Sequence, residues 1–215
     1  MKENIITYAI IFNGRSRGTL LRQYLTSTQA AGTPREYGKE TENFFDFLAN
    51  CRRNNVQGFL IKFNLLHRIA HFLDADVKYI YLQRENKIKQ AISALKAKKN
   101  DYSNGPEVPN DSPFSLERTD FQYIESMVSH YTHAEIYARD FFSEKGITPF
   151  QIFYKHLATH EDRCKKIVEI LNFLGIPPES MNPPKSNLVS QHTVWNDEVY
   201  RMYKEYLREK GETNE

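Results

Sequence analysis

A short basic loop near the N-terminus contains the residue types of an anion site. Arg15-Ser-Arg-Gly-Thr19 follows a β-branched apolar run and precedes residues with helical spacing. A helix that begins after a parallel strand points its unpaired N–H groups toward the ligand crevice, where an anion is a natural guest. Arg15 and Arg17 supply guanidinium groups, and Ser16 supplies a hydroxyl. Thr19 adds a second hydroxyl, and Gly18, which has no Cβ, lets backbone approach phosphate oxygens closely.

This loop differs from a Walker A motif. Three residues instead of four separate Gly14 from Gly18, and Thr19 stands where that motif has lysine. ATP hydrolysis of the P-loop kind is therefore a poor fit. A P-loop kinase of small molecules is kept as a third hypothesis, which would require Mg-dependent ATP binding. A surface turn with exposed arginines is the alternative to an anion site.

A second basic position follows another apolar run. Arg84 lies at the end of a predicted strand, and Ser93 lies nine residues later in a helix predicted to begin near Glu85. The pair can hold a second phosphate if this helix crosses the same crevice. Taken alone, Arg84 could also be a solvated residue at the start of a helix, and Ser93 could be a helix residue without a special role. Two separated phosphate sites on one sheet would suit a nucleotide phosphorylated at both ends of its ribose.

Two further residues could act on a reacting group. Glu36 follows Gly32 and Pro34, which favour a turn that places a carboxylate above the crevice. Lys62 ends the apolar run of another predicted strand. A solvated loop glutamate and a surface lysine are the corresponding alternatives.

The elements that must position these residues alternate between short apolar runs and helical patterns. This alternation predicts an α/β fold with a central, mainly parallel sheet flanked by helices. Strands are predicted at residues 5–12, 58–63, 77–82 and 150–154, and helices at 19–27, 65–73, 87–98, 121–142, 161–174 and 197–210. Residues 29–37 and 99–115 are unassigned, and the second stretch is interpreted as a lid or acceptor loop or as surface disorder. A single domain is expected over residues 1–208, with a flexible tail at 209–215.

Composition excludes several classes of protein. With 40% hydrophobic residues the chain can bury a core, and a formal charge of +2 indicates no general electrostatic grip on nucleic acid. Cys51 and Cys164 have no ligand spacing and fit reduced thiols in the cytoplasm. The histidines form no His-Glu-x-x-His pattern, so no metal is expected. The run at 5–12 is too short to span a membrane.

The motifs resemble, in order, those of the bacterial carbohydrate sulfotransferases typified by trehalose 2-sulfotransferase. They are RSRGTLL, AAGTPREYG, GFLIKFNLL, YIYLQRENKIKQAIS, ITPFQIFYKHL and IVEILNFLGI, spread over about residues 5–207. The resemblance implies a P-loop-NTPase-like three-layer sandwich. It also implies transfer of a sulfuryl group from 3'-phosphoadenosine-5'-phosphosulfate (PAPS) to a carbohydrate or glycolipid hydroxyl, by an enzyme that forms a homodimer. The missing targeting signal and a donor made inside cells predict a cytoplasmic setting.

The resemblance also assigns the donor residues. Arg15, Ser16 and Thr19 would hold the 5'-phosphosulfate, with Arg15 stabilising much of the developing charge. Arg84 and Ser93 would hold the 3'-phosphate and give the preference for PAPS.

The acceptor side follows from the same resemblance. Glu36 occupies the position of the general base, and Lys62 would point to the sulfuryl oxygens or to the acceptor.

The chain departs from the family pattern at the loop and in one later segment. The family loop usually reads Arg-Ser-Gly-Ser-Thr, whereas here Arg17 replaces the glycine and Gly18 the second serine. Arg17 could add a phosphate contact or obstruct the donor. Lys155-His156 replaces a usual acidic pair, so an altered acceptor site is expected. A catalytically degenerate nucleotide-binding or interaction protein is therefore the second hypothesis.

Overall fold

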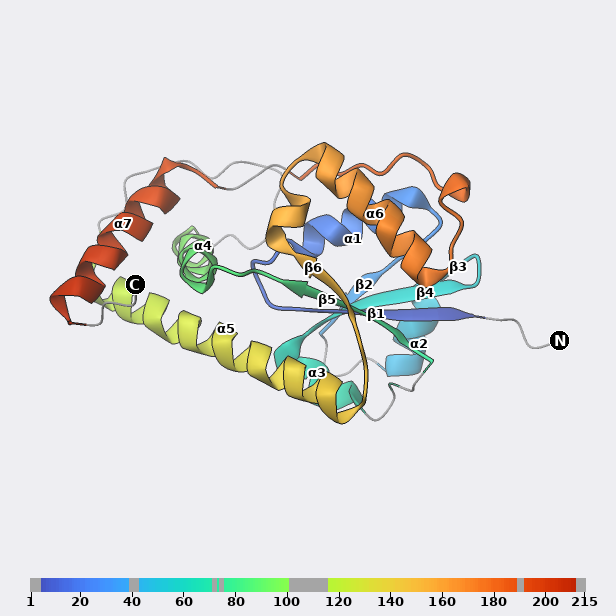
Figure 1. Ribbon diagram of the computed structural model, residues 1–215, viewed down its shortest axis with the longest axis horizontal. Helices are drawn as coiled ribbons and strands as arrows, with labels where there is room; N and C mark the ends of the chain where they lie inside the picture. Colours follow the sequence, from blue (N-terminus) through green and yellow to red (C-terminus); the bar gives the residue numbers. More distant parts are fainter. Residues whose placement is uncertain are drawn as a thin grey trace. The chain divides into compact units, whose positions relative to one another are not determined.

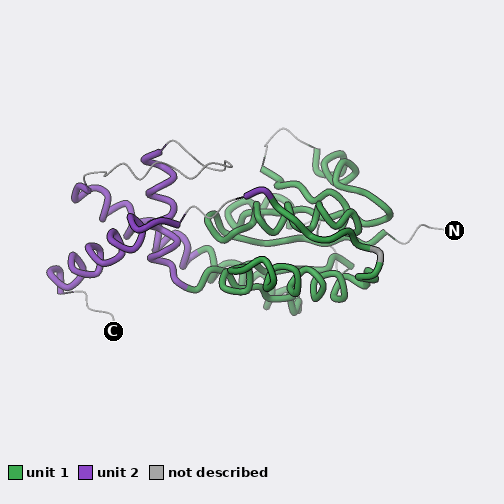
Figure 2. The backbone as a smooth tube through the Cα atoms, turned by 90° about the horizontal axis from the view of Figure 1, so that it is seen from above, with its two compact units in different colours: residues 1–85, 134–186 green, residues 86–133, 187–215 purple. Residues whose placement is uncertain are grey.

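The computed structural model describes residues 5–38, 43–70, 73, 76–100, 116–188 and 192–211. Two compact units share the chain (Figure 2). Unit 1 comprises residues 1–85 and 134–186, and unit 2 comprises residues 86–133 and 187–215. Residues 101–115 of the loop predicted at 99–115 and residues 212–215 of the predicted tail lie outside the described residues.

Within the described residues, unit 1 is built on a six-stranded sheet in the order β2-β4-β1-β5-β6, with β3 beside β4 (Figure 1). All pairings are parallel except that of β3 with β4. The strands are β1 (Ile6–Phe12), β2 (Arg35–Tyr37), β3 (Arg52–Arg53), β4 (Val56–Lys62), β5 (Lys78–Gln83) and β6 (Phe150–Phe153).

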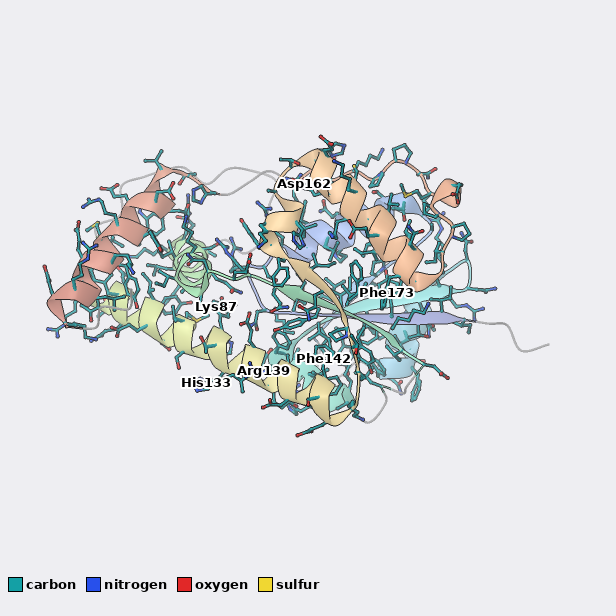
Figure 3. The ribbon with its side chains drawn as sticks, viewed as in Figure 1. Lys87, His133, Arg139, Phe142, Asp162 and Phe173 are labelled. Carbon is teal, nitrogen blue, oxygen red and sulfur yellow. The ribbon has the colours of Figure 1, made fainter. Side chains whose placement is uncertain are left out.

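Helices cover both faces of this sheet, which confirms the predicted α/β architecture. Strand β1 shows why both faces need cover, since Tyr8 and Ile10 enter one core and Ala9 and Ile11 the other. Helices α1 (Gly18–Thr28) and α6 (His160–Leu174) supply the first core. The second core contains side chains of α2 (Phe44–Asn50), α3 (Phe63–Ile69) and the C-terminal part of α5 (Arg118–Glu144), including Phe142, which is labelled in Figure 3.

Strand β4 needs a glycine at the position that pairs with Tyr8 of β1. Gly58 is the register partner of Tyr8, and a Cβ on Gly58 would lie 2.0 Å from Tyr8 Cζ. The Tyr8 ring uses this space, and its hydroxyl donates to the carbonyl oxygen of Ala31 over 2.8 Å. Burial raises the pKa of the Tyr8 hydroxyl, which therefore stays a neutral donor. This bond anchors the segment that leads into β2.

Unit 2 is a small helical assembly. Its helices are α4 (Lys87–Lys99), the N-terminal part of α5, and α7 (Val194–Glu209). Trp195 and Tyr203 of α7 pack in a shared core with Ile92 and Ile124. Trp195 is thus a packing residue in this unit.

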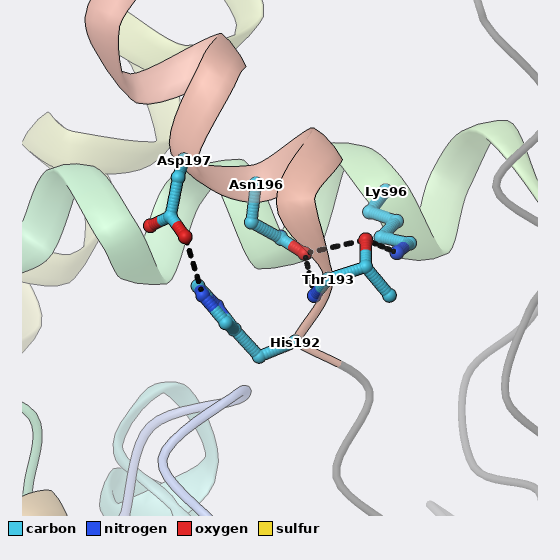
Figure 4. A network of polar contacts seen from close by, with 5 residues as sticks. All are labelled: Lys96, His192, Thr193, Asn196 and Asp197. Atoms are coloured by element: carbon cyan, nitrogen blue, oxygen red, sulfur yellow. Dashed lines mark hydrogen bonds and ion pairs between the residues drawn. The ribbon is translucent and has the colours of Figure 1, made fainter.

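Helix α7 begins with a network of polar contacts, drawn in Figure 4. The backbone N–H of Thr193 donates to Asn196 Oδ1 over 3.0 Å, and buried Lys96 donates from Nζ to Thr193 Oγ1 over 2.6 Å. His192 Nε2 lies 3.0 Å from Asp197 Oδ2. These contacts satisfy groups at the helix start and tie α7 to α4.

Most predicted elements are confirmed to within about two residues, but the stretch after α1 is not. Residues 29–37, unassigned from the sequence, contain strand β2, and α2 and β3 were not predicted. Strand β2 escapes pattern reading because it is three residues long at the sheet edge and carries no apolar alternation. The helix predicted at 65–73 is α3, which spans Phe63–Ile69. The 3-10 helices η2 (Tyr154–Leu157) and η3 (Pro178–Ser180) were not predicted either.

Candidate functional site

The carboxyl ends of the parallel strands bring the predicted site residues to one edge of the sheet. Phe12 at the end of β1 is in register with Lys62 in β4 and with Leu82 in β5. On the far side of β4, Tyr37 is in register with Ile61. The basic loop, Lys62, Arg84 and Glu36 therefore belong to the same edge of unit 1.

The helical connections that follow β1 and β4 run over opposite faces of the sheet. Helix α1, which follows β1, packs on one face, and α3, which follows β4, packs on the other. The crossovers consequently diverge next to β1, and ligands of open α/β sheets bind at such a switch point.

The basic loop has an unusual backbone. Arg15 and Arg17 have φ angles of 62° and 73°, in the left-handed region. Ser16 between them is fully buried, and its hydroxyl donates to the carbonyl oxygen of Asn13 over 2.6 Å. Left-handed residues other than glycine persist where the surroundings hold them. Ser16 closes the turn from within, so its side chain shapes the loop.

Gly18 has a packing role at the start of α1. A Cβ at this position would lie 2.6 Å from ring atoms of Phe12. The absence of a side chain lets the first turn of α1 lie directly on the end of β1. Thr19 follows in the same turn.

Arg84 lies beside this loop. Its Nη1 donates to the carbonyl oxygen of Arg15 over 3.1 Å, and its residue exposure is 9%. The Arg84 Cζ atom lies 4.2 Å from the ring centroid of Tyr154. The structure therefore joins two of the predicted phosphate-binding positions, Arg15 and Arg84, through a direct contact.

Arg17 contacts protein groups that the sequence did not indicate. Its Nη1 donates to the carbonyl oxygens of Tyr154, over 3.1 Å, and Leu157. Its Cζ atom lies 3.9 Å from the ring centroid of Tyr154. Burial lowers the pKa of the Arg17 guanidinium, and the charge of Arg163 acts in the same direction.

Tyr154 is the residue of this edge that sequence reasoning missed. It begins η2 directly after β6, whose Phe153 is in register with Gln83 at the end of β5. An aromatic residue directly after a parallel strand was the available signal, but strand-end tyrosines are common in cores. Its contacts with Arg17 and Arg84 depend on residues more than 60 positions away in the chain.

Glu36 and Lys62 form an ion pair. Lys62 Nζ lies 2.8 Å from Glu36 Oε1, and the side chains are 44% and 35% exposed respectively. Strands β2 and β4 place them, because Glu36 is in register with Leu60, two residues before Lys62. A half-exposed carboxylate beside a cation can take a proton from a hydroxyl that approaches this edge.

Ser93 is assigned to a different compact unit from the other predicted site residues. It belongs to α4 of unit 2, within a helix as predicted. Its assignment to the 3'-phosphate stays a prediction.

The described residues contain no group of three or more His, Cys, Asp and Glu side chains placed to hold a metal ion. No helix in the described part of the chain is both long and apolar enough to cross a membrane.

Comparison with known proteins gives one family and two similar folds. Residues 62–206, more than half of the chain, match the family described as Stf0 sulphotransferase. Lys62, Arg84 and Ser93 lie inside this span, whereas the basic loop and Glu36 precede it. No curated protein gave a significant match.

The solved structures extend the likeness to the N-terminal part. A sulfotransferase from Alicyclobacillus acidocaldarius superposes with a TM-score of 0.55 at 11% identity, covering 94% of this chain and 92% of that one. The sulfotransferase domain from the curacin biosynthetic pathway gives 0.51 at 16% identity, with 89% and 82% covered. At these identities the likeness concerns the fold alone, and it confirms the predicted P-loop-related α/β class.

Proposed function

The chain belongs to the Stf0 sulphotransferase family, and on this premise we propose that it transfers a sulfuryl group from PAPS to a carbohydrate or glycolipid hydroxyl. Family membership implies a PAPS-dependent sulfotransferase. One observation supports the assignment of donor and acceptor. The contact between Arg84 and Arg15, after β5 and β1, and the pair of Glu36 and Lys62, in β2 and β4, belong to the same carboxyl end of neighbouring strands.

The basic loop would bind the 5'-phosphosulfate. The N-terminus of α1 directs backbone N–H groups and the positive end of its dipole at the loop. Arg15 would stabilise charge on the leaving phosphate, and Thr19 would add a hydroxyl. Ser16 and Gly18 would act through the backbone shape described above, since the Ser16 hydroxyl bonds to Asn13.

Arg84 would bind the 3'-phosphate. A guanidinium group that is nine-tenths buried interacts strongly with an anion because little water screens the charges. This contact would distinguish PAPS from nucleotides without a 3'-phosphate.

Glu36 would act as the general base of an in-line transfer. The acceptor oxygen forms a bond to sulfur, and its proton passes to a carboxylate oxygen of Glu36. The bond between sulfur and the bridging oxygen breaks, and its electron pair leaves on the 5'-phosphate. Lys62 orients Glu36 through the 2.8 Å ion pair and would face the sulfuryl oxygens. Positioning and charge stabilisation would supply most of the rate.

Two measurements together test this proposal. Calorimetric titration should show tighter binding of the product 3',5'-bisphosphate than of ADP, and labelled PAPS should transfer sulfate to a member of a carbohydrate and glycolipid panel. Preference for ADP with a Mg dependence would favour a small-molecule kinase instead. A cytoplasmic homodimer is proposed from the family resemblance, and light scattering on the purified chain tests the dimer.

A catalytically degenerate binding protein is the second candidate, because Arg17 stands at the family's glycine position. It predicts bisphosphate binding without turnover on any acceptor.

A further inference from the structure

We propose that Arg17 is a positioning residue that clamps the basic loop to η2, and that the ring of Tyr154 is the shared support of Arg17 and Arg84. Arg17 would then act on the donor through the loop and not as a direct phosphate ligand. The inference rests on the proposed function for its effect on the donor. The clamp itself is a property of the protein alone.

The polar contacts of Arg17 are directed at η2. The end of a short helix leaves carbonyl groups without an intrahelical donor. Arg17 Nη1 and Arg163 Nε both donate to the carbonyl oxygen of Leu157, the latter over 2.9 Å, and Arg163 Nη2 donates to Ala158 over 2.7 Å. Two arginines thus satisfy the C-terminal carbonyls of η2, one from the basic loop and one from α6.

The face of the Arg17 guanidinium is used as well. Its Cζ lies 3.9 Å from the Tyr154 centroid, close to the 4.2 Å of Arg84. Cations at such distances are attracted by the electron-rich face of the ring. Arg84 in turn donates to the carbonyl oxygen of Arg15, two residues before Arg17. The contacts form a closed circuit from Arg15 through Arg84 and Tyr154 back to Arg17.

This circuit explains how arginine can occupy a position where glycine is usual in the family. Glycine adopts a φ of 73° without cost, whereas arginine pays a steric penalty there. The bonds to η2 offset that penalty, and they hold the side chain against η2. Nη1 makes both carbonyl bonds and the ring of Tyr154 packs on the guanidinium, so η2 fixes the orientation of the Arg17 side chain before any donor binds.

The first test compares Arg17→Ala and Arg17→Lys, with Arg22→Ala, in the helix that follows Arg17, as the matched control. Both Arg17 variants should weaken the 3',5'-bisphosphate about tenfold and lower the melting temperature of the ligand-free protein, because neither keeps the forked and stacked contacts. Their salt dependence of Kd should equal that of the wild type. A direct ligand would behave otherwise: Arg17→Lys would keep most of the affinity, Arg17→Ala would reduce the salt dependence, and the ligand-free melting temperature would not change. That pattern would overturn the clamp.

The second test is a double-mutant cycle with Tyr154. Tyr154→Leu should weaken binding of the bisphosphate as much as Arg17→Ala does. Tyr154→Phe keeps the ring, so its Kd for the bisphosphate should be close to that of the wild type. Because both residues belong to one circuit, the double variant Arg17→Ala with Tyr154→Leu should be little weaker than either single variant. Additive losses would overturn the shared support.

Hydrogen exchange of the ligand-free protein separates the two proposals. If the wild type failed to bind the bisphosphate, the proposed function would fail, but faster exchange at residues 14–19 in Arg17→Lys than in Arg22→Ala would still support the clamp. Equal exchange in these two variants would overturn it.

Discussion

The two halves of the sheet edge differ in how the protein holds them. On the proposed donor side, beside β1 and β5, Arg84 is nine-tenths buried, Ser16 is fully buried, and Tyr154 contacts two arginines. On the proposed acceptor side, at β2 and β4, the pair of Glu36 and Lys62 is more than a third exposed, and β2 is an edge strand of the sheet.

The difference in burial fits two roles, rigid binding on one side and an adaptable site on the other. A dense network keeps a binding loop in one conformation, which suits a donor that is the same in every reaction. A half-exposed pair at an edge strand leaves room for an acceptor of varied shape. Substitutions on the donor side should therefore change binding and stability, and those on the acceptor side should change turnover.

The largest effect is expected from Glu36→Gln, which keeps the shape of the side chain and removes the base. The turnover number should fall about 10²- to 10⁴-fold, while the Kd of the 3',5'-bisphosphate stays unchanged. Steady-state kinetics and calorimetry measure the two quantities, and Glu161→Gln on α6 is the exposed control. Transfer at the original rate would show that the base is elsewhere.

Arg84→Ala should have the next largest effect, on binding. The affinity for the bisphosphate should fall roughly 30-fold or more, because a buried cation that is proposed to pair with phosphate is removed. Adenosine 5'-phosphate should lose only the part of the affinity that comes from loosening the basic loop, so the ratio of the two Kd values reports on the 3'-phosphate contact. An unchanged ratio would contradict this assignment of Arg84.

Gly18→Ala tests the packing of the donor side. A Cβ at 2.6 Å from the Phe12 ring should lower the free energy of unfolding by about 1–3 kcal/mol. Denaturant titration measures the change. Adding Phe12→Leu should recover part of it if the clash with the ring is the cause.

Lys62→Met should affect stability less than Gly18→Ala. The ion pair with Glu36 is substantially exposed, so its loss should change the free energy of unfolding by less than about 1 kcal/mol. A larger loss would mean that the acceptor side is as tightly built as the donor side.

The smallest effect is a pH dependence from His156 in η2. Burial lowers the pKa of His156, and the charges of Lys166 and Lys155 lower it further. The unfolded chain, with a pKa near 6.5, therefore binds this proton more readily than the folded one. The contribution of neutral His156 to the free energy of unfolding is therefore complete above about pH 6.5, and it is lost as the pH falls through the lower pKa of the folded state. His156→Gln should flatten the loss of melting temperature below pH 6.5.

Local patterns were sufficient for much of this structure. Strand β1 and the helix after the basic loop have residue types that favour their local conformations. The end of α6 was equally readable, because Gly175 closes it in the left-handed conformation, with φ 77°. The left-handed φ angles of Arg15 and Arg17 are not favoured by residue type. Strand β2 was not readable, because it is held by pairing with β4 and by little in its own residues.

The sequence by itself determined the order of the longer strands and helices, the family, and the basic loop at the carboxyl end of β1. Only the tertiary structure decided that Glu36 faces Lys62, and that Arg17 ends on carbonyls up to 140 residues away. The reason is physical: local propensity acts over a few residues, whereas these contacts form when parallel strands align their ends and bring distant segments to one edge.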